Sequence, residues 1–142
     1  MKLQIEELYG ILPLLKPFAG QETSATTQWR VSKLLRAMIT EFKPAEEERV
    51  RLVSKYGEKD EKGVLVKDQD GNTAIADEEG FMGEWTELLG QEVEIAHPGL
   101  KDKDIEAIVE VLEKLGKKIS IAHVNLLDRL IEAKSDTPKD GG

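Results

Sequence analysis

The segment DQDGN, residues 68–72, comes closest to a metal site in this chain. Its two aspartates and Gly71, followed by Asp77, are residue types found in calcium-binding loops. Such a loop needs glycine at its sixth position, and this alignment puts Val66 at the first position, where a carboxylate ligand belongs. Asp77 would then replace the bidentate glutamate at position twelve. We therefore interpret the segment as a hairpin turn and predict no metal site.

The sequence patterns that indicate zinc binding or catalysis are also incomplete. His97 and His123 are the only imidazoles, neither belongs to an HExxH pair, and the chain has no cysteine to complete a zinc site. None of the serines lies in a G-x-S-x-G context, and there is no Walker or G-x-G-x-x-G loop. The 28 acids always offer carboxylate pairs, but the sequence singles out none. We predict a protein that is not an enzyme and holds no cofactor.

The length and composition indicate one folded domain. The chain has 142 residues, of which 39% are hydrophobic and 34% charged. This is enough for one core but short for two. No apolar run approaches the roughly 20 residues of a membrane-spanning helix, and acids occupy the place of the apolar stretch of a signal peptide. We predict a domain over residues 1–134, a disordered tail over 135–142, and no membrane partner.

The charge is concentrated in one stretch. Residues 61–94 contain ten acids and two bases, a net charge of −8 that equals the charge of the whole chain. An acidic chain is a poor candidate for binding nucleic acid, which requires a basic face. Arg30, Lys33 and Arg36 do recur at helical spacing, and we interpret them as a solvated helix face.

Hydrophobic periodicity indicates two helices in the first half of the chain. The first extends from about Leu3 to Leu15. The second is long, and its apolar stripe continues past Pro44 to Tyr56, so the sequence leaves open one kinked helix or two. Gly57 is placed to end it as the residue after the C-cap. Members of this stripe are Trp29, Leu34, Leu35, Met38, Ile39, Phe42, Val50 and Val53.

The second half of the chain mixes strands and helices. Val64–Lys67 and Asn72–Ala76 read as a hairpin, and Glu92–Ile95 alternates as a third strand. Helices are predicted over Glu78–Leu89, from Asp102 or Asp104 to Leu115, and after Ser120, with Ile121, Val124, Leu127, Leu130 and Ile131 inward. No internal repeat is apparent. The predicted fold class is α+β: one helix-dominated domain with a small antiparallel sheet.

One surface stands out as a candidate for binding a partner. Core packing is the usual role of a tryptophan, but Trp85 lies among acids, and an exposed tryptophan is a common anchor in protein interfaces. The candidate partner-binding residues are therefore Asp77, Glu78, Glu79, Glu84, Trp85 and Glu87.

The central part of the chain contains an acidic run with an arginine (Glu46–Arg49), a K-Y-G-E-x-D-x-x-G turn (Lys55–Gly63), E-L-L (Glu87–Leu89) and E-V-E-I (Glu92–Ile95). This pattern resembles that of a family of small uncharacterised proteins of tailed bacteriophages and prophages. A final S-x-A helix, Ile119 to Glu132, is also similar. The chain departs from the pattern in a longer DQDGNTAIADEEG stretch and in residues 105–115. The resemblance implies a phage origin and transfers no functional residue.

These observations lead to two expectations about function. The first is a non-enzymatic phage accessory protein that acts through protein contacts, in virion assembly or as a minor virion component. The alternative is an early acidic protein that binds a host machine such as RNA polymerase or a nuclease, with a DNA mimic as a special case. Either would work in the host cytoplasm, the first also in the virion. An exposed apolar stripe on the long helix would favour a homo-oligomer.

Overall fold

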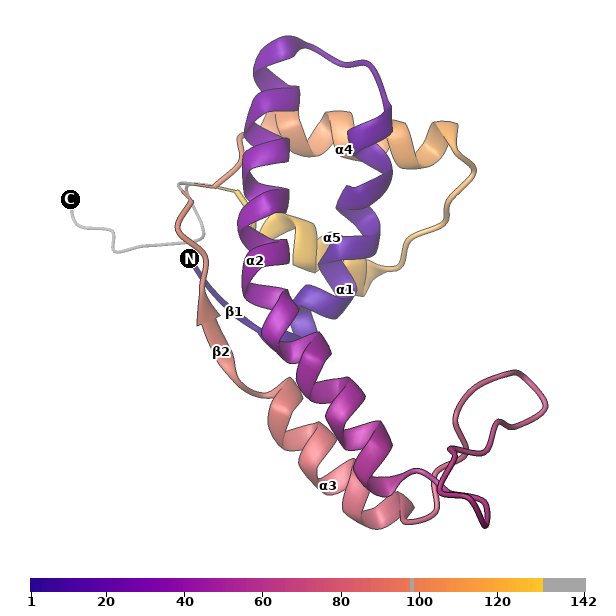
Figure 1. The fold of residues 1–142 in the computed structure, drawn as a ribbon. Coiled ribbons are helices and arrows are strands. Elements are labelled where there is room, and N and C mark those ends of the chain that lie inside the picture. Colours follow the sequence, from indigo (N-terminus) through magenta and orange to yellow (C-terminus); the bar gives the residue numbers. More distant parts are fainter. Residues whose placement is uncertain (98, 132–142) are drawn as a thin grey trace.

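The computed structural model describes residues 1–97 and 99–131, and Figure 1 shows its helix-dominated α+β fold. This confirms the predicted class. No helix in these two ranges is long and apolar enough to cross a membrane. The elements in chain order are β1 (Lys2–Gln4), α1 (Ile5–Leu15), a 3-10 helix (Lys16–Gly20), α2 (Ala25–Tyr56), α3 (Glu78–Leu89), β2 (Glu92–Glu94), α4 (Asp102–Lys114) and α5 (Ile121–Asp128).

The helices α1 and α4 pack on the first half of α2, α5 packs on α1, and together they form a head with one apolar core (Figure 1). α1 is apolar on most of its sides and is the most deeply buried helix. A helix that is hydrophobic almost all round requires neighbours on every side, which explains its place between α2, α4 and α5. Its fully buried side chains include Leu8, Ile11 and Leu15, which meet Leu34 and Met38 of α2 and Ile108 of α4 in the core.

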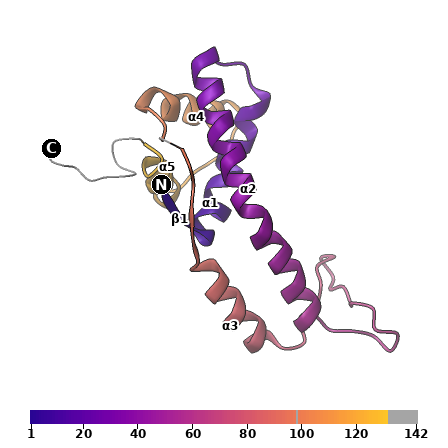
Figure 2. The same ribbon diagram turned by 60° about the vertical axis from the view of Figure 1, so that its left-hand side comes forward.

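α2 is a single helix of 32 residues. Pro44 lies inside it on the exposed side. Of the two alternatives that the sequence left open, one helix or two, the structure therefore shows one helix. Ser24 caps its start by accepting a hydrogen bond from the backbone N–H of Thr27. Its second half leaves the head and runs beside α3 (Figure 2). We call this α2–α3 pair the arm.

The sheet differs from the predicted one. β1 pairs antiparallel with β2, with Leu3 opposite Val93, and the hairpin segments take no part in it. Leu3 and Gln4, predicted as the start of a helix, therefore belong to a strand. Alternation explains this pairing, since Leu3 is 1% exposed in the core while its neighbours Lys2 and Gln4 face solvent.

Residues 57–76 form a module of three short segments at the end of the arm. Each segment pairs with both others: Glu58 N–H donates to Ala74 O, Ala74 N–H to Val66 O, and Val66 N–H to Glu58 O, at 2.7–2.8 Å. The bridges are isolated, so the predicted strands Val64–Lys67 and Asn72–Ala76 pair locally but form no regular ladder. We call residues 57–76 the three-segment module.

A short repeat that sequence inspection missed builds this module. The pattern Asp-x-x-Gly occurs at residues 60–63, 68–71 and 77–80. Asp60 and Asp68 each accept two backbone N–H groups through Oδ1, at 2.8–3.0 Å, and each glycine that follows has a positive φ. Asp77 instead accepts from Gly80 and caps α3. The aspartates of the segment that came closest to a calcium loop therefore include one that shapes a turn.

Gly57 ends α2 for a different reason from the predicted one. Its backbone is extended, with φ −72°, and not left-handed. A Cβ there would lie 2.5 Å from the Val53 carbonyl oxygen and 2.7 Å from Leu65 Cδ2. Glycine is required because the module folds back closely onto the end of the helix.

Several residues predicted to face inward are exposed. Trp29 is 59% exposed, and Ile121 and Val124 of α5 are 79% and 50% exposed. α5 has only eight residues, and its buried contact comes from Leu127, together with Leu130 just after the helix. Leu115, just after α4, was also predicted to face inward but is exposed, whereas Val111 of α4 is buried. The predicted tail 135–142 lies outside the described residues.

Candidate interaction surface

The arm is less buried than the head, and among the described residues its buried side chains are Ala45 and Leu52 of α2. α3 has no fully buried residue, and only one of its faces rests on α2. Phe81, Trp85, Leu88 and Leu89 on that face are all half-buried. A helix pair that lacks a third layer leaves both edges of its apolar seam open to solvent. The two edges of the arm carry different chemistry.

One edge carries a continuous row of aromatic rings. Phe42 of α2 meets Tyr9 of α1 edge-on with ring centroids 4.6 Å apart, and Tyr9 meets Trp85 of α3 at 5.4 Å. Trp85 stacks with Phe81 at 6.1 Å, and Phe81 meets Tyr56 at 6.5 Å. These separations lie in the favourable range for aromatic pairs. We call these five half-buried residues the aromatic row.

A polar network lies beside the row. The Tyr9 hydroxyl donates to Glu46, and Arg49 contacts the same carboxylate at 3.3 Å. Burial, followed by the hydrogen bond to Glu46, raises the pKa of Tyr9 far above its ordinary value. The Tyr9 hydrogen bond is also the main reason that the pKa of Glu46 lies below its ordinary value, with Arg49 acting in the same direction. The network therefore holds the Tyr9 side chain in one position through its hydroxyl group, which a ring without a hydroxyl could not do.

The opposite edge of the arm is charged. Glu84 of α3 accepts hydrogen bonds from Lys55, at 2.8 Å, and from the hydroxyl of Tyr56, the last ring of the aromatic row, which connects the two edges at the end of α2. Arg51 lies 3.7 Å from Glu84. These hydrogen bonds, Lys55 first, lower the pKa of Glu84. Arg51 also pairs with Glu48 at 2.5 Å. This edge is therefore internally neutralised to a large extent.

The structure divides the predicted partner-binding residues among three settings. Asp77 caps α3, and Glu84 and Trp85 belong to the α2–α3 contact described above. Glu78 and Glu79 are exposed in the first turn of α3, where carboxylates complement the helix dipole. Glu87 is exposed near the other end. A role of these six residues in binding stays a prediction.

Both histidines are structural in the described ranges. His97 Nδ1 accepts from the Gly99 N–H at 3.0 Å, and burial lowers the pKa of His97. His123 Nδ1 accepts from the Ser120 N–H at 3.0 Å and completes a capping box at the start of α5. Within residues 1–97 and 99–131, no three His, Asp or Glu side chains are grouped closely enough to hold a metal ion.

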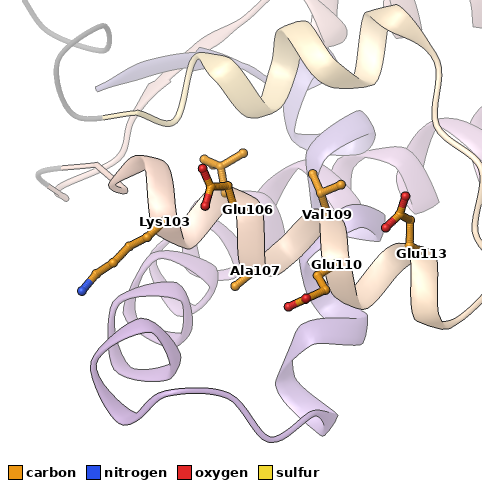
Figure 3. A pocket seen from close by; sticks show the side chains of 7 residues that line it. Lys103, Glu106, Ala107, Val109, Glu110 and Glu113 are labelled. Atoms are coloured by element: carbon orange, nitrogen blue, oxygen red, sulfur yellow. The ribbon is translucent and has the colours of Figure 1, made fainter.

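A shallow hollow on α4 is a weak candidate for a binding site. Every residue that lines it comes from this one helix, including the acids Glu106, Glu110 and Glu113 (Figure 3). A ligand pocket needs walls from several elements that enclose most of the ligand. This surface is better described as the solvated face of an amphipathic helix.

The aromatic row was not visible as one feature in the sequence, because its members come from three separate helices. The one local signal was Phe81 and Trp85 at i,i+4 spacing.

Comparisons with protein-family models, with curated proteins and with solved structures found no match to this chain.

Proposed function

We propose that this protein is a non-enzymatic accessory protein of a tailed bacteriophage, acting through protein contacts in virion assembly or as a minor virion component. The phage assignment rests on the sequence pattern of residues 46–63 and 87–95. The contact surface is the aromatic edge of the arm, and this edge is the observation that carries the proposal.

Three properties make the aromatic edge suitable for a partner. It contains tyrosine, tryptophan and arginine, the residue types that dominate binding energy in protein interfaces. Its aromatic side chains are half-buried and so already ordered, which lowers the entropy cost of binding. Val50 extends this edge with a side chain that is 55% exposed. It lies four residues after Glu46 and three before Val53, so the three side chains are neighbours on the same side of α2.

Virion composition tests the proposal. Phage carrying Val50→Lys should contain much less of the protein in purified particles or assembly intermediates than wild-type phage, measured by quantitative mass spectrometry. Ile121→Lys is the matched control, since it introduces the same charge at an exposed apolar position on the head. Absence of the wild-type protein from both virions and intermediates would exclude the assembly role. Equal incorporation of Val50→Lys would exclude the aromatic edge.

The exposed acids of the arm support a second candidate, an early protein that binds a host machine. No lysine or arginine occurs between Asp68 and Leu100. A DNA mimic needs acids free to imitate phosphates, whereas Asp68 and Asp77 accept backbone hydrogen bonds and Glu84 is paired with Lys55. The mimic is thus the less favoured form of this candidate. Retention of a host protein at low salt and its release at high salt would support host binding, and no retention at low salt would exclude it.

A further inference from the structure

The start of α2 presents a hollow that the proposed function does not use. Trp29, 59% exposed, stands at its side, with Lys33 over the indole ring at 4.4 Å from the centroid. We call this surface the Trp29 hollow. Its walls come from the 3-10 helix, the loop before α2 and the first turns of α2, and the lining residues are Ala19, Gln21, Glu22, Thr23, Ala25, Gln28, Trp29, Ser32 and Arg36.

The Trp29 hollow is basic on its α2 side. Residues 25–40 contain three bases and no acid. Arg30 points to the head and pairs with Asp104. Lys33 and Arg36 are exposed, and neither forms an ion pair with another residue of the described ranges. An exposed tryptophan beside two unpaired cations is suited to a surface that offers carboxylates and an apolar side chain.

The outer face of α3 is such a surface. It turns away from α2 and carries the exposed residues Glu79, Met82 and Glu87. Met82 is 52% exposed. Gly83 lies between them, and a Cβ there would have no atom within 4 Å, so a neighbouring molecule could approach the backbone closely. This face therefore carries acids and one flexible apolar side chain, and it is flat at Gly83.

The two surfaces cannot meet within one molecule. Trp29 lies in the first turns of α2, and α3 packs on its second half (Figure 2). Val53 follows Trp29 by 24 positions in the same helix, which corresponds to roughly 36 Å at 1.5 Å per residue. Contact between them has to occur between copies, and because the surfaces differ, the contact is head-to-tail.

We propose that a second copy of this chain occupies the Trp29 hollow with the outer face of its α3. Met82 of one copy packs against Trp29 of the next, and Glu79 and Glu87 face Lys33 and Arg36. Each copy keeps one free hollow and one free α3 face, so the association continues into open chains or closes into a ring. The inference is independent of the proposed function, which uses the aromatic edge of the arm.

Mixing two complementary variants tests this proposal. Trp29→Ala disables the hollow by removing the ring that Met82 would contact, and Glu79→Lys with Glu87→Lys disables the α3 face. The two altered surfaces do not complement each other, because Lys33 and Arg36 repel the new lysines. Sedimentation from micromolar to millimolar concentrations should show growth beyond the dimer for the wild type and weakening of self-association by about tenfold or more in each variant. An equimolar mixture of the two should recover association but stop at one-to-one dimers, because each partner then has one intact surface.

The charge control is Glu106→Lys with Glu110→Lys on α4. It changes the net charge by the same amount as the α3 variant, so any effect of relieving overall repulsion appears in both. The control should associate at least as well as the wild type. Circular dichroism establishes that each variant is folded. A wild type that stays monomeric overturns the proposal, as does a mixture that associates no better than the separate variants.

Discussion

The ion pair between Asp104 and Arg30 joins α4 to α2, and its loss provides the sharpest test of how the head is held together. The Asp104 side chain is fully buried and the Arg30 side chain is 16% exposed. Arg30 Nε and Nη2 donate to the two carboxylate oxygens at 2.7 and 3.0 Å, and the Lys101 N–H donates to Oδ2 at 2.9 Å. Asp104 thus caps α4 and neutralises Arg30 at once.

The expected magnitude follows from this burial. Removing one member of a buried ion pair costs about 3–5 kcal/mol, because the remaining charge has no compensation. Asp104→Asn keeps one acceptor oxygen but turns an amide group towards Arg30, so we expect a loss of about 3 kcal/mol in the free energy of unfolding. This is a large share of the roughly 5–15 kcal/mol typical of a domain. It corresponds to a fall of roughly 10 °C in Tm.

Urea unfolding at neutral pH, arranged as a double-mutant cycle with Arg30→Met, measures this energy. The double variant should lose less stability than the sum of the single variants, because it buries no unpaired charge. Glu48→Gln, which removes the exposed partner of Arg51, is the control and should change the unfolding free energy only slightly. A loss below about 1 kcal/mol for Asp104→Asn, or full additivity, would refute this account.

The same ion pair predicts a dependence on pH. Burial raises the pKa of Asp104, but hydrogen bonds from Arg30, the Lys101 N–H and Thr27 outweigh it and hold the pKa below its ordinary value. A carboxyl group with a lowered folded-state pKa contributes stability that is present above its unfolded pKa, near 4, and is lost as pH falls through the folded pKa. The difference between wild type and Asp104→Asn should therefore shrink below about pH 4.

Three further predictions concern single residues. Gly57→Ala should destabilise the chain because the added Cβ meets the last turn of α2. Gly83→Ala adds its Cβ in open space within α3 and should stabilise the monomer by up to about 1 kcal/mol. Thermal unfolding of the two variants measures both effects. Tyr9→Phe removes the main cause of the lowered pKa of Glu46, so an NMR titration should show that pKa rise; an unchanged pKa would exclude the hydrogen bond in solution. Burial, aided by Lys33, lowers the pKa of His97, so stability should decline as pH falls from about 6.5 towards the folded pKa, and His97→Gln should abolish that slope in urea unfolding.

Local patterns in the sequence predicted several elements well. α3 has the predicted bounds, Glu78–Leu89, because its apolar residues repeat at helical spacing and Asp77 and Gly90 mark its ends. Ser120 caps α5 as predicted. In each case the signal and the structure depend on residues within one or two turns of each other.

Interactions between distant residues could not be predicted in this way. β1 has three residues, and its partner β2 lies about ninety positions later, so no local pattern separates it from the helix that follows. Periodicity identified an apolar stripe on α2 but not where other elements would cover it, and Trp29 therefore appeared to belong to the core. The candidate residues at α3 were chosen by charge and aromaticity, which do not reveal that Glu84 and Trp85 contact α1 and α2.

The number of elements explains why the arm has exposed apolar edges. In the head, α1 and α4 pack on the first half of α2 and α5 packs on α1, whereas α3 is the helix that packs along the second half. One helix can cover only one face of another, so a residue beside that face, such as Val50 of α2, stays in contact with water. Adding apolar residues to α3 would not change this, since a third layer is missing. A partner that supplies this layer would gain apolar burial without unfolding anything, which is the physical reason to assign the contact surface to the arm and not to the head.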